Sequence, residues 1–129
     1  MPNFKSIFRV VDSGAGQSAT GGNQGDVTER IRSDVESNDV LIYMKGTREF
    51  PQCGFSAATI EAFNALGVPY ATRDVLEDPE LRQGVKDFSN WPTIPQVYVG
   101  GKFIGGCDIV TDLSNRGELA GVVKENLPK

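Results

Sequence analysis

Residues 40–75 read VLIYMKGTREFPQCGFSAATIEAFNALGVPYATRDV, and this stretch decides the fold. Val40 to Met44 is a continuous apolar run, which is typical of a strand covered on both faces. After a polar loop, the apolar spacing within residues 56–66 predicts a helix that ends at Gly67. Residues 70–75 predict a second strand. A strand–helix–strand unit of this kind implies two parallel strands joined by a right-handed crossover.

Helix signals continue on both sides of this unit. An Asp-x-x-Glu capping pattern, followed by apolar residues every four positions, predicts a helix that starts at Asp26. Asp78, with a proline directly after it, predicts the start of another helix. Asp108 is predicted to cap a further helix whose apolar residues include Ile109, and Gly117 separates that helix from a last one.

A hairpin supplies the other two strands. Residues 96–99 and 102–105 flank Gly100-Gly101, and a two-glycine turn between such segments strongly favours antiparallel pairing. The predicted order is helix, strand, helix, strand, helix, two strands and two helices. We therefore predict an α/β fold with a four-stranded mixed sheet flanked by about five helices, an arrangement that resembles the thioredoxin layout.

Composition excludes several kinds of chemistry. The 129 residues include 13 Lys and Arg against 17 Asp and Glu, and the formal charge of −4 argues against nucleic acid or an acidic membrane as a partner. The longest apolar run has five residues, whereas a membrane-spanning helix needs about 20. The absence of histidine removes Ser–His and Cys–His hydrolases and histidine-ligated metals. Two cysteines complete neither a disulfide framework nor a four-ligand zinc site.

The first 25 residues differ in composition from the rest. Residues 13–25 carry no charge and no large apolar side chain, so we expect a flexible tail ahead of a folded domain over residues 26–129. Residues 1–12 contain Lys5 and Arg9 and no acidic residue before position 12. This pattern fits the remnant of an organellar transit peptide, and it equally fits a tail without such a role.

Cys53 is the main candidate for a reactive group. It is predicted to lie at the junction between the first strand and the next helix, where unpaired backbone N–H groups and the helix dipole stabilise a thiolate. A cysteine buried beneath a loop is the alternative, and the position in this topology disfavours it. The residue three positions on is Ser56, so Cys53 cannot resolve its own mixed disulfide through a C-x-x-C pair.

Two further segments are candidates for a binding site. In the segment Asn-Trp-Pro-Thr-Ile-Pro before the hairpin, Pro95 is the candidate for a cis peptide bond, which would open the backbone of Ile94 to an extended peptide; a plain tight turn is the alternative. In Gly-Gly-Cys-Asp at 105–108, the helix start could hold a carboxylate and Asp108 could accept an ammonium group, which together describe the head of an amino acid. Cys107 is either a second thiol near the site or a packing residue.

Three cations are candidates for binding an anion. Lys45 directly follows the first strand, and Arg82 and Lys86 lie one helical turn apart on the face opposite the apolar stripe. In an acidic domain, basic groups gathered at one edge suit a small anionic ligand. A solvated helix face is the default interpretation for Arg82 and Lys86 taken alone.

These segments together resemble a known family, the single-domain monothiol glutaredoxins, and within it the mitochondrial iron–sulfur assembly branch most closely. The motifs that carry the resemblance are Lys45, Cys-Gly-Phe-Ser at 53–56, Trp-Pro-Thr-Ile-Pro at 91–95 and Gly-Gly-Cys-Asp at 105–108. The five-residue spacer at 47–51 is similar to that of the monothiol class. The similarity covers about residues 27–127.

The resemblance implies a thioredoxin/glutaredoxin fold that binds glutathione. The residues that would form the glutathione site are Lys45, Phe55, Arg82, Lys86, Trp91, Thr93, Ile94, Pro95, Gly106, Cys107 and Asp108. Lys45 and Arg82 would hold the glycine carboxylate, with Lys86 in an assisting role, and the backbone of Ile94 would pair with the cysteinyl unit. Cys107 and Asp108 would receive the γ-glutamyl head, while Phe55 and Trp91 would shape the pocket.

The resemblance also implies a carrier that delivers [2Fe-2S] clusters to apoproteins as a homodimer. Cys53 would be the catalytic thiol and the cluster ligand, and two glutathione thiols would complete the usual four thiolates. The alternatives are a weak glutathione-dependent thiol–disulfide oxidoreductase that uses Cys53, and an inert interaction domain in which Cys53 is dispensable. Expected partners are apo iron–sulfur proteins, BolA-like proteins and assembly chaperones. The expected location is the mitochondrial matrix, with the cytoplasm or another organelle as the alternative.

Overall fold

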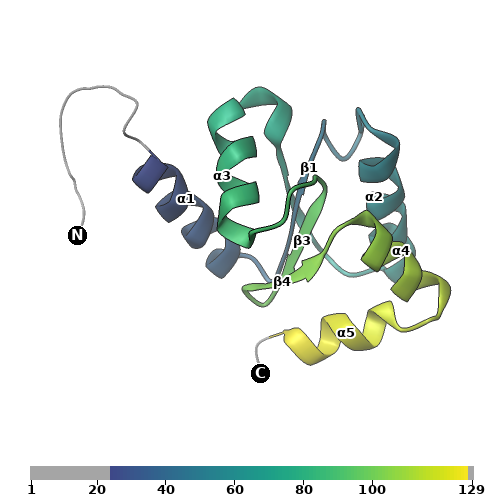
Figure 1. The fold of residues 1–129 in the computed structure, drawn as a ribbon. Helices are drawn as coiled ribbons and strands as arrows, with labels where there is room; N and C mark the ends of the chain where they lie inside the picture. The colour runs from purple at the N-terminus through teal and green to yellow at the C-terminus, as the bar shows by residue number, and fades with distance from the viewer. Residues whose placement is uncertain (1–23, 128–129) are drawn as a thin grey trace.

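The computed structural model describes residues 24–127, and it confirms the predicted order of elements and the thioredoxin/glutaredoxin fold (Figure 1). The elements are α1 (Gln24–Ser37), β1 (Val40–Met44), α2 (Gly54–Leu66), β2 (Ala71–Asp74), a short 3-10 helix η2 (Val75–Glu77), α3 (Pro79–Ser89), β3 (Gln96–Val99), β4 (Lys102–Gly105), α4 (Cys107–Asn115) and α5 (Leu119–Asn126). The predicted flexible tail and transit-peptide remnant lie almost wholly outside the described residues. None of the helices within residues 24–127 is long and apolar enough to cross a membrane.

The four strands form one mixed sheet in the order β2-β1-β3-β4. Strand β1 pairs in parallel with β2 and antiparallel with β3, and β3 pairs antiparallel with β4. The predicted crossover and hairpin are both confirmed, and the turn residues Gly100 and Gly101 have φ of 59° and 84°, a region that favours glycine. Because β1 and β2 are parallel, their carboxyl ends lie at the same edge of the sheet, where α2 and α3 begin.

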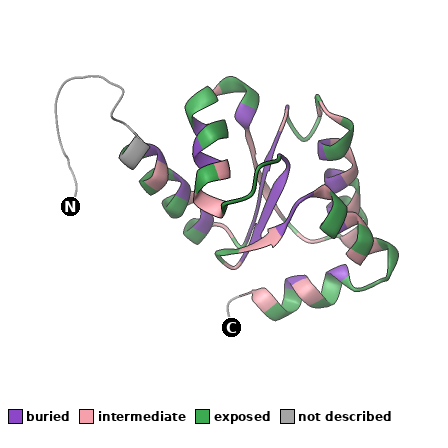
Figure 2. Cartoon of the chain, viewed as in Figure 1, coloured by how far each residue is buried: buried purple, intermediate pink, exposed green. Residues whose placement is uncertain are grey.

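Two apolar layers cover the sheet, one on each face. Leu41 and Tyr43 of β1 face a cluster formed with α1 and α3, whereas Val40, Ile42 and Met44 face a cluster formed with α2, α4 and α5. Figure 2 shows the central strands as buried and the outer sides of the helices as exposed. The two-sided burial explains why β1 is apolar at every position, as predicted.

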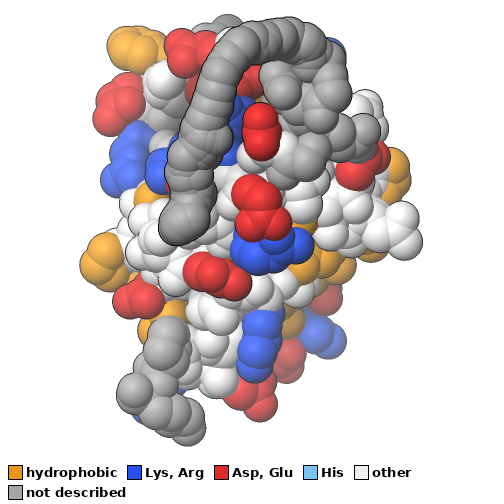
Figure 3. Space-filling model, turned by 90° about the vertical axis from the view of Figure 1, so that its left-hand side faces the viewer, with side chains coloured by type: hydrophobic (Ala, Val, Ile, Leu, Met, Phe, Trp, Pro, Cys, Tyr) orange, Lys and Arg blue, Asp and Glu red, His pale blue; other side chains and the backbone are white. Residues whose placement is uncertain are grey.

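Helix α1 packs closely on α3. Gly84 of α3 lies against Val27 and Ile31 of α1, and a Cβ atom at position 84 would come within 2.3 Å of the Val27 side chain. Arg30 of α1 also donates to the Asp78 carboxylate at 2.8 Å, and Asp78 caps α3 by accepting from the N–H of Leu81. The capping role of Asp78 was predicted and is confirmed. On the face turned to the viewer in Figure 3, acidic and basic side chains are interspersed.

Two predicted helix starts were wrong by two residues. Helix α1 already includes Gln24, so Asp26 lies in its first turn and is not its cap. Helix α2 begins at Gly54 and not at residue 56, because Cys53 already has the extended backbone of a cap, with φ of −151°. The added residues are Gln24 and Gly25 in α1, which are not apolar, and Gly54 and the exposed Phe55 in α2, so the spacing of buried apolar residues does not detect them.

The prediction that Asp108 caps its helix was also wrong. Gly106 is the cap and α4 begins at Cys107, so Asp108 lies inside the first turn. Gly105 has φ of 150° and Gly106 has an extended backbone, and the chain enters the helix two residues earlier than predicted. Ile109, which was expected on the apolar side, is 38% exposed, whereas Val110 beside it is fully buried. Neighbouring residues point about 100° apart on a helix, so only one of them faces the core.

Candidate functional site

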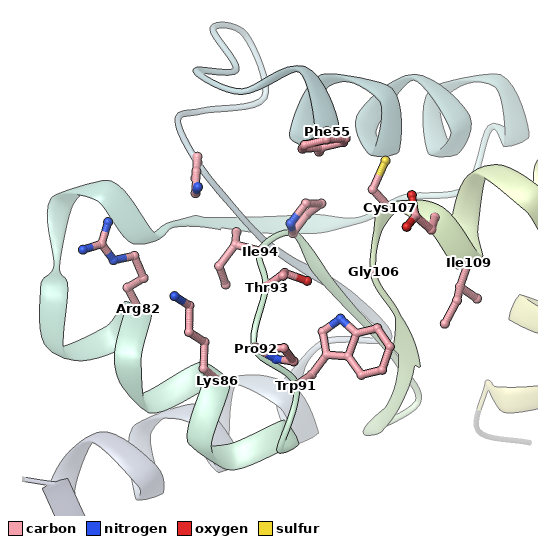
Figure 4. A pocket seen from close by; sticks show the side chains of 13 residues that line it. Phe55, Arg82, Lys86, Trp91, Pro92, Thr93, Ile94, Gly106, Cys107 and Ile109 are labelled. Carbon is pink, nitrogen blue, oxygen red and sulfur yellow. The ribbon is translucent and has the colours of Figure 1, made fainter.

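A groove of about 350 Å³ opens between α3, the segment before β3 and the start of α4. Figure 4 shows Arg82 and Lys86 on one side, Gly106 and Cys107 on the other, and Thr93 and Ile94 between them. The residues that line the groove are Lys45, Phe55, Arg82, Lys86, Trp91, Pro92, Thr93, Ile94, Pro95, Gly106, Cys107, Asp108 and Ile109. The fold therefore gathers all eleven residues of the predicted glutathione site around one cavity.

Cys53 lies at the rim of this groove. It is not one of the lining residues, but its neighbours Lys45 and Phe55 are, and its side chain is partly exposed. The pKa of the Cys53 thiol is lowered, chiefly by the backbone N–H of Ser56, and also by the N–H of Phe55 and the charge of Lys45, while partial burial opposes the shift. The predicted low-pKa thiol at a helix start is therefore found.

The start of α2 is fixed to the end of β1 by Ser56. The Ser56 side chain is fully buried, and its Oγ accepts a hydrogen bond of 3.1 Å from the N–H of Lys45. The Ser56 hydroxyl also contributes to lowering the pKa of Cys53. Ser56 thus links α2 to the end of β1 and helps to lower the pKa of the Cys53 thiol. It occupies the position where a C-x-x-C site has its second cysteine.

The loop between β1 and Cys53 is folded back on itself. Gln52 donates its N–H to the carbonyl of Lys45 at 2.9 Å, and Gly46 pairs with Pro51 in an isolated bridge. The Asp74 carboxylate at the end of β2 accepts from the N–H of Gly46 at 2.9 Å. The predicted spacer is therefore an ordered loop that is held from two sides, which fixes the approach of the chain to Cys53.

We expect the lowered pKa of Cys53 to appear as a shift in the pH dependence of alkylation. The thiolate is the reacting form, so the midpoint of the rate should lie at lower pH in the folded protein than in the protein unfolded in urea. Iodoacetamide labelling followed by mass spectrometry on a Cys107→Ser background measures both midpoints.

Charge substitutions test the cause of this shift. Lys45→Gln should raise the midpoint, because it removes a positive charge near the sulfur. Lys102→Gln removes an exposed lysine at the opposite end of the sheet and should leave the midpoint unchanged. Equal midpoints in the folded and unfolded proteins would contradict the assignment.

The segment before β3 presents an open stretch of backbone to the groove. The Ile94–Pro95 bond is cis, as predicted, and the Ile94 side chain is buried. Within residues 24–127, neither the N–H nor the C=O of Ile94 has a hydrogen-bond partner. An extended ligand can therefore pair with Ile94 as a short added strand.

Charges of opposite sign lie on the two sides of the groove. Arg82 and Lys86 line the groove from α3, but each directly follows a buried residue, Leu81 or Val85, and so lies about 100° round the helix from it and not on the opposite face that was predicted. Asp108 lies in the first turn of α4, beside backbone N–H groups that have no partner inside the helix. The groove can therefore accommodate an anionic group at α3 and both charges of an amino-acid head at α4.

Cys107 lies in the groove and not in the core. It is partly exposed, and its Sγ lies 3.6 Å from Oγ1 of Thr111. Both cysteines are unpaired. No group of three or more His, Cys, Asp or Glu residues within residues 24–127 could hold a metal ion by itself.

The sequence analysis did not assign Pro92 and Ile109 to the site. Pro92 lies between Trp91 and Thr93, which were both assigned to the site, so its place in this motif could have identified it. Ile109 follows Asp108 directly and could have been identified from the angle between successive helix residues, since Val110 occupies the buried face.

Comparisons with known proteins identify a family. The family model described as Glutaredoxin matches residues 40–104. The protein named monothiol glutaredoxin-5, mitochondrial, of Saccharomyces cerevisiae is 52% identical over 103 residues, which cover 78% of this chain and 69% of the relative. An uncharacterized ycf64-like monothiol glutaredoxin of Synechocystis is 56% identical over 90 residues, covering 70% of this chain and 84% of the relative. The solution structure of reduced poplar apo GrxS14 superposes with a TM-score of 0.71 at 39% identity, covering 81% of this chain and 96% of that one.

Proposed function

Because this chain belongs to the glutaredoxin family, and to its monothiol class, we propose that it binds glutathione and carries [2Fe-2S] clusters to apoproteins as a homodimer. The observation that carries this proposal is the Cys53 thiol, whose pKa is lowered, at the rim of a groove that gathers the predicted ligand-binding residues. A carrier must hold its cargo firmly enough to protect it and weakly enough to release it. A site whose ligands are partly exchangeable meets both needs.

The groove chemistry supports glutathione as the ligand. Glutathione has a carboxylate at each end and an ammonium group at its γ-glutamyl end. Lys45, Arg82 and Lys86 supply positive charge for the glycine carboxylate, and the first turn of α4 with Asp108 suits the γ-glutamyl head. The open backbone of Ile94 lies between these two regions and suits the peptide unit around the cysteine.

The number of thiols supports a shared cluster. A [2Fe-2S] cluster usually takes four thiolates. One Cys53 from each of two chains supplies two, and two bound glutathione molecules would supply the others. In this arrangement half of the ligands are small molecules that can leave, which favours transfer to an apoprotein with stronger ligands.

Anaerobic reconstitution tests this function. The protein is incubated with iron and sulfide, with and without glutathione, and examined by visible absorption and size-exclusion chromatography. A coloured dimer that forms only with glutathione supports the carrier. A colourless monomer under both conditions rejects it, and a cluster that forms equally well without glutathione rejects the role of glutathione as a ligand.

A glutathione-dependent oxidoreductase is the second candidate, and the lowered pKa of Cys53 favours it. The Cys53 thiolate would attack the glutathione sulfur of a mixed disulfide and release the other thiolate. A second glutathione would then reduce the Cys53–glutathione disulfide and leave as glutathione disulfide. Fast turnover of a glutathionylated peptide by a protein that assembles no cluster would favour this candidate.

We also propose the mitochondrial matrix as the location, and apo iron–sulfur proteins, BolA-like proteins and assembly chaperones as partners. The yeast relative that is 52% identical is named mitochondrial, which supports this location. Imaging of the full chain with a C-terminal fluorescent tag tests the location. Affinity purification from isolated mitochondria tests the partners.

Asp108→Ala should weaken glutathione binding more than it lowers the melting temperature. The substitution removes the carboxylate proposed to face the ligand's ammonium group, while α4 keeps its Gly106 cap. Asp112→Ala is the matched control, because Asp112 is exposed on the same helix and pairs with the surface Arg116. Calorimetry measures both affinities, and equal affinity in Asp108→Ala and the wild type would remove Asp108 from the site.

A further inference from the structure

Gln96 is a polar side chain in the middle of the core. It is fully buried at the start of β3, directly after the cis proline. Its Nε2 donates to the carbonyl of Trp91 at 3.1 Å and to that of Thr93 at 3.2 Å. Its Oε1 accepts from the hydroxyl of Tyr98 at 3.2 Å. Every polar atom of the side chain therefore has a partner.

The partners allow only one orientation of the Gln96 amide. Two carbonyl oxygens can only accept, so the NH₂ group must face them. The hydroxyl of Tyr98 must then donate to Oε1, and burial raises the pKa of Tyr98 to about 12, which keeps that proton in place over the physiological pH range. A glutamate, a methionine or a leucine at position 96 could not provide the two donors.

The hydrogen bonds of Gln96 fix the direction of the backbone before β3. The first residue of the segment is held in other ways as well, since the N–H of Trp91 bonds to Lys86 and Ser89 and its ring packs on Phe103. The carbonyl of Thr93 has Gln96 as its hydrogen-bond partner. With these carbonyls turned inward, the free backbone edge of Ile94 is left for the groove.

We propose that Gln96 is a positioning residue, which orients the backbone of residues 91–95 so that Ile94 can pair with the ligand. This inference rests on the proposed binding of glutathione in the groove. Gln96 itself is not a lining residue, so it acts through the segment that it holds. Its removal should alter ligand affinity without removing any group that touches the ligand.

Two variants separate this role from a general contribution to folding. Gln96→Met keeps the length of the side chain but removes both donors to the loop. Tyr98→Phe removes only the hydroxyl that bonds to Oε1 and leaves both donors in place. Both variants should lower the melting temperature, because each leaves a buried polar group without its partner.

Glutathione affinity and the fluorescence of Trp91 distinguish the two variants. We expect Gln96→Met to raise the Kd for glutathione roughly tenfold and to shift the emission of Trp91, the one tryptophan of the chain. Tyr98→Phe should stay within roughly twofold of the wild-type Kd, with an unchanged emission maximum. Wild-type affinity in Gln96→Met, or an equal loss of affinity in both variants, overturns the proposal.

A measurement on the unmodified protein covers the case in which Gln96→Met does not fold. The side-chain amide protons of Gln96 should exchange with solvent at least roughly tenfold more slowly than those of the exposed Gln52 and Gln83. Equal exchange rates in the NMR spectrum overturn the proposal. If the wild type does not bind glutathione at all, the proposed function fails, while Trp91 emission and amide exchange still test whether Gln96 holds the segment.

Discussion

We expect Cys53→Ser to fold normally and to remain colourless after reconstitution with iron, sulfide and glutathione. A serine hydroxyl stays protonated at neutral pH and does not replace a thiolate as a ligand of iron. Stability should be kept or raised, because residue 53 caps α2 and serine is a favoured cap residue. Nearly all of the visible absorption should therefore be lost while the melting temperature is preserved.

Cys107→Ser is the control for this prediction. Cys107 also lies in the groove, and two cysteines from each of two chains could supply four thiolates without glutathione. The proposed arrangement requires that Cys107→Ser still forms a glutathione-dependent coloured dimer. Loss of the cluster in Cys107→Ser, or its persistence in Cys53→Ser, would show that the ligands have been assigned wrongly.

Gly84→Ala should destabilise the protein by about 1–3 kcal/mol, the usual cost of forcing an extra methyl group into a packed contact. The new Cβ would lie 2.3 Å from a methyl carbon of Val27 and 3.1 Å from Ile31, so α1 and α3 would have to separate. Residue 84 lies between Arg82 and Lys86 in α3, so a displaced helix should also weaken the binding of the ligand carboxylate.

Gly121→Ala is the matched substitution for this test. Gly121 also lies within a helix, α5, and a Cβ there would meet nothing within 4 Å. Helix propensity alone favours alanine by about 0.5–1 kcal/mol, so this variant should be more stable than the wild type. Urea unfolding measures both changes. A Gly84→Ala protein as stable as Gly121→Ala would show that the two helices are not in close contact.

The sequence was sufficient to predict the elements whose residues are uniformly buried or that carry a specific turn signal. β1 is apolar at all five positions because both of its faces are covered, and the Gly100-Gly101 turn occupies backbone conformations that favour glycine. The residues of the groove were found because each lies in a short motif at the end of an element, and the topology brings those ends together.

The errors and omissions lie where backbone conformation or a specific hydrogen bond, and not the apolar pattern, decides the structure. The start of α4 depends on the backbone conformation of Gly105 and Gly106. Asp108 is a residue type that often caps helices, but it lies in the first turn and Gly106 is the cap. The role of Gln96 was not predicted, since a polar residue at a strand start is ordinary until its partners in residues 91–95 are known. The hydrogen bond from the N–H of Gly46 to the Asp74 carboxylate was not predicted either, because 28 positions separate the two residues in the sequence.

The two outer strands of the sheet are poor templates for another chain. β2 and β4 have only four residues each, β4 departs from regular register near Val97 and begins with Lys102, and Arg73 of β2 is engaged with Asp34 of α1. Edge strands that are short, charged or irregular disfavour aggregation through strand pairing between molecules. An extended peptide is therefore more readily paired with the open backbone of Ile94 in the groove than with either outer strand of the sheet.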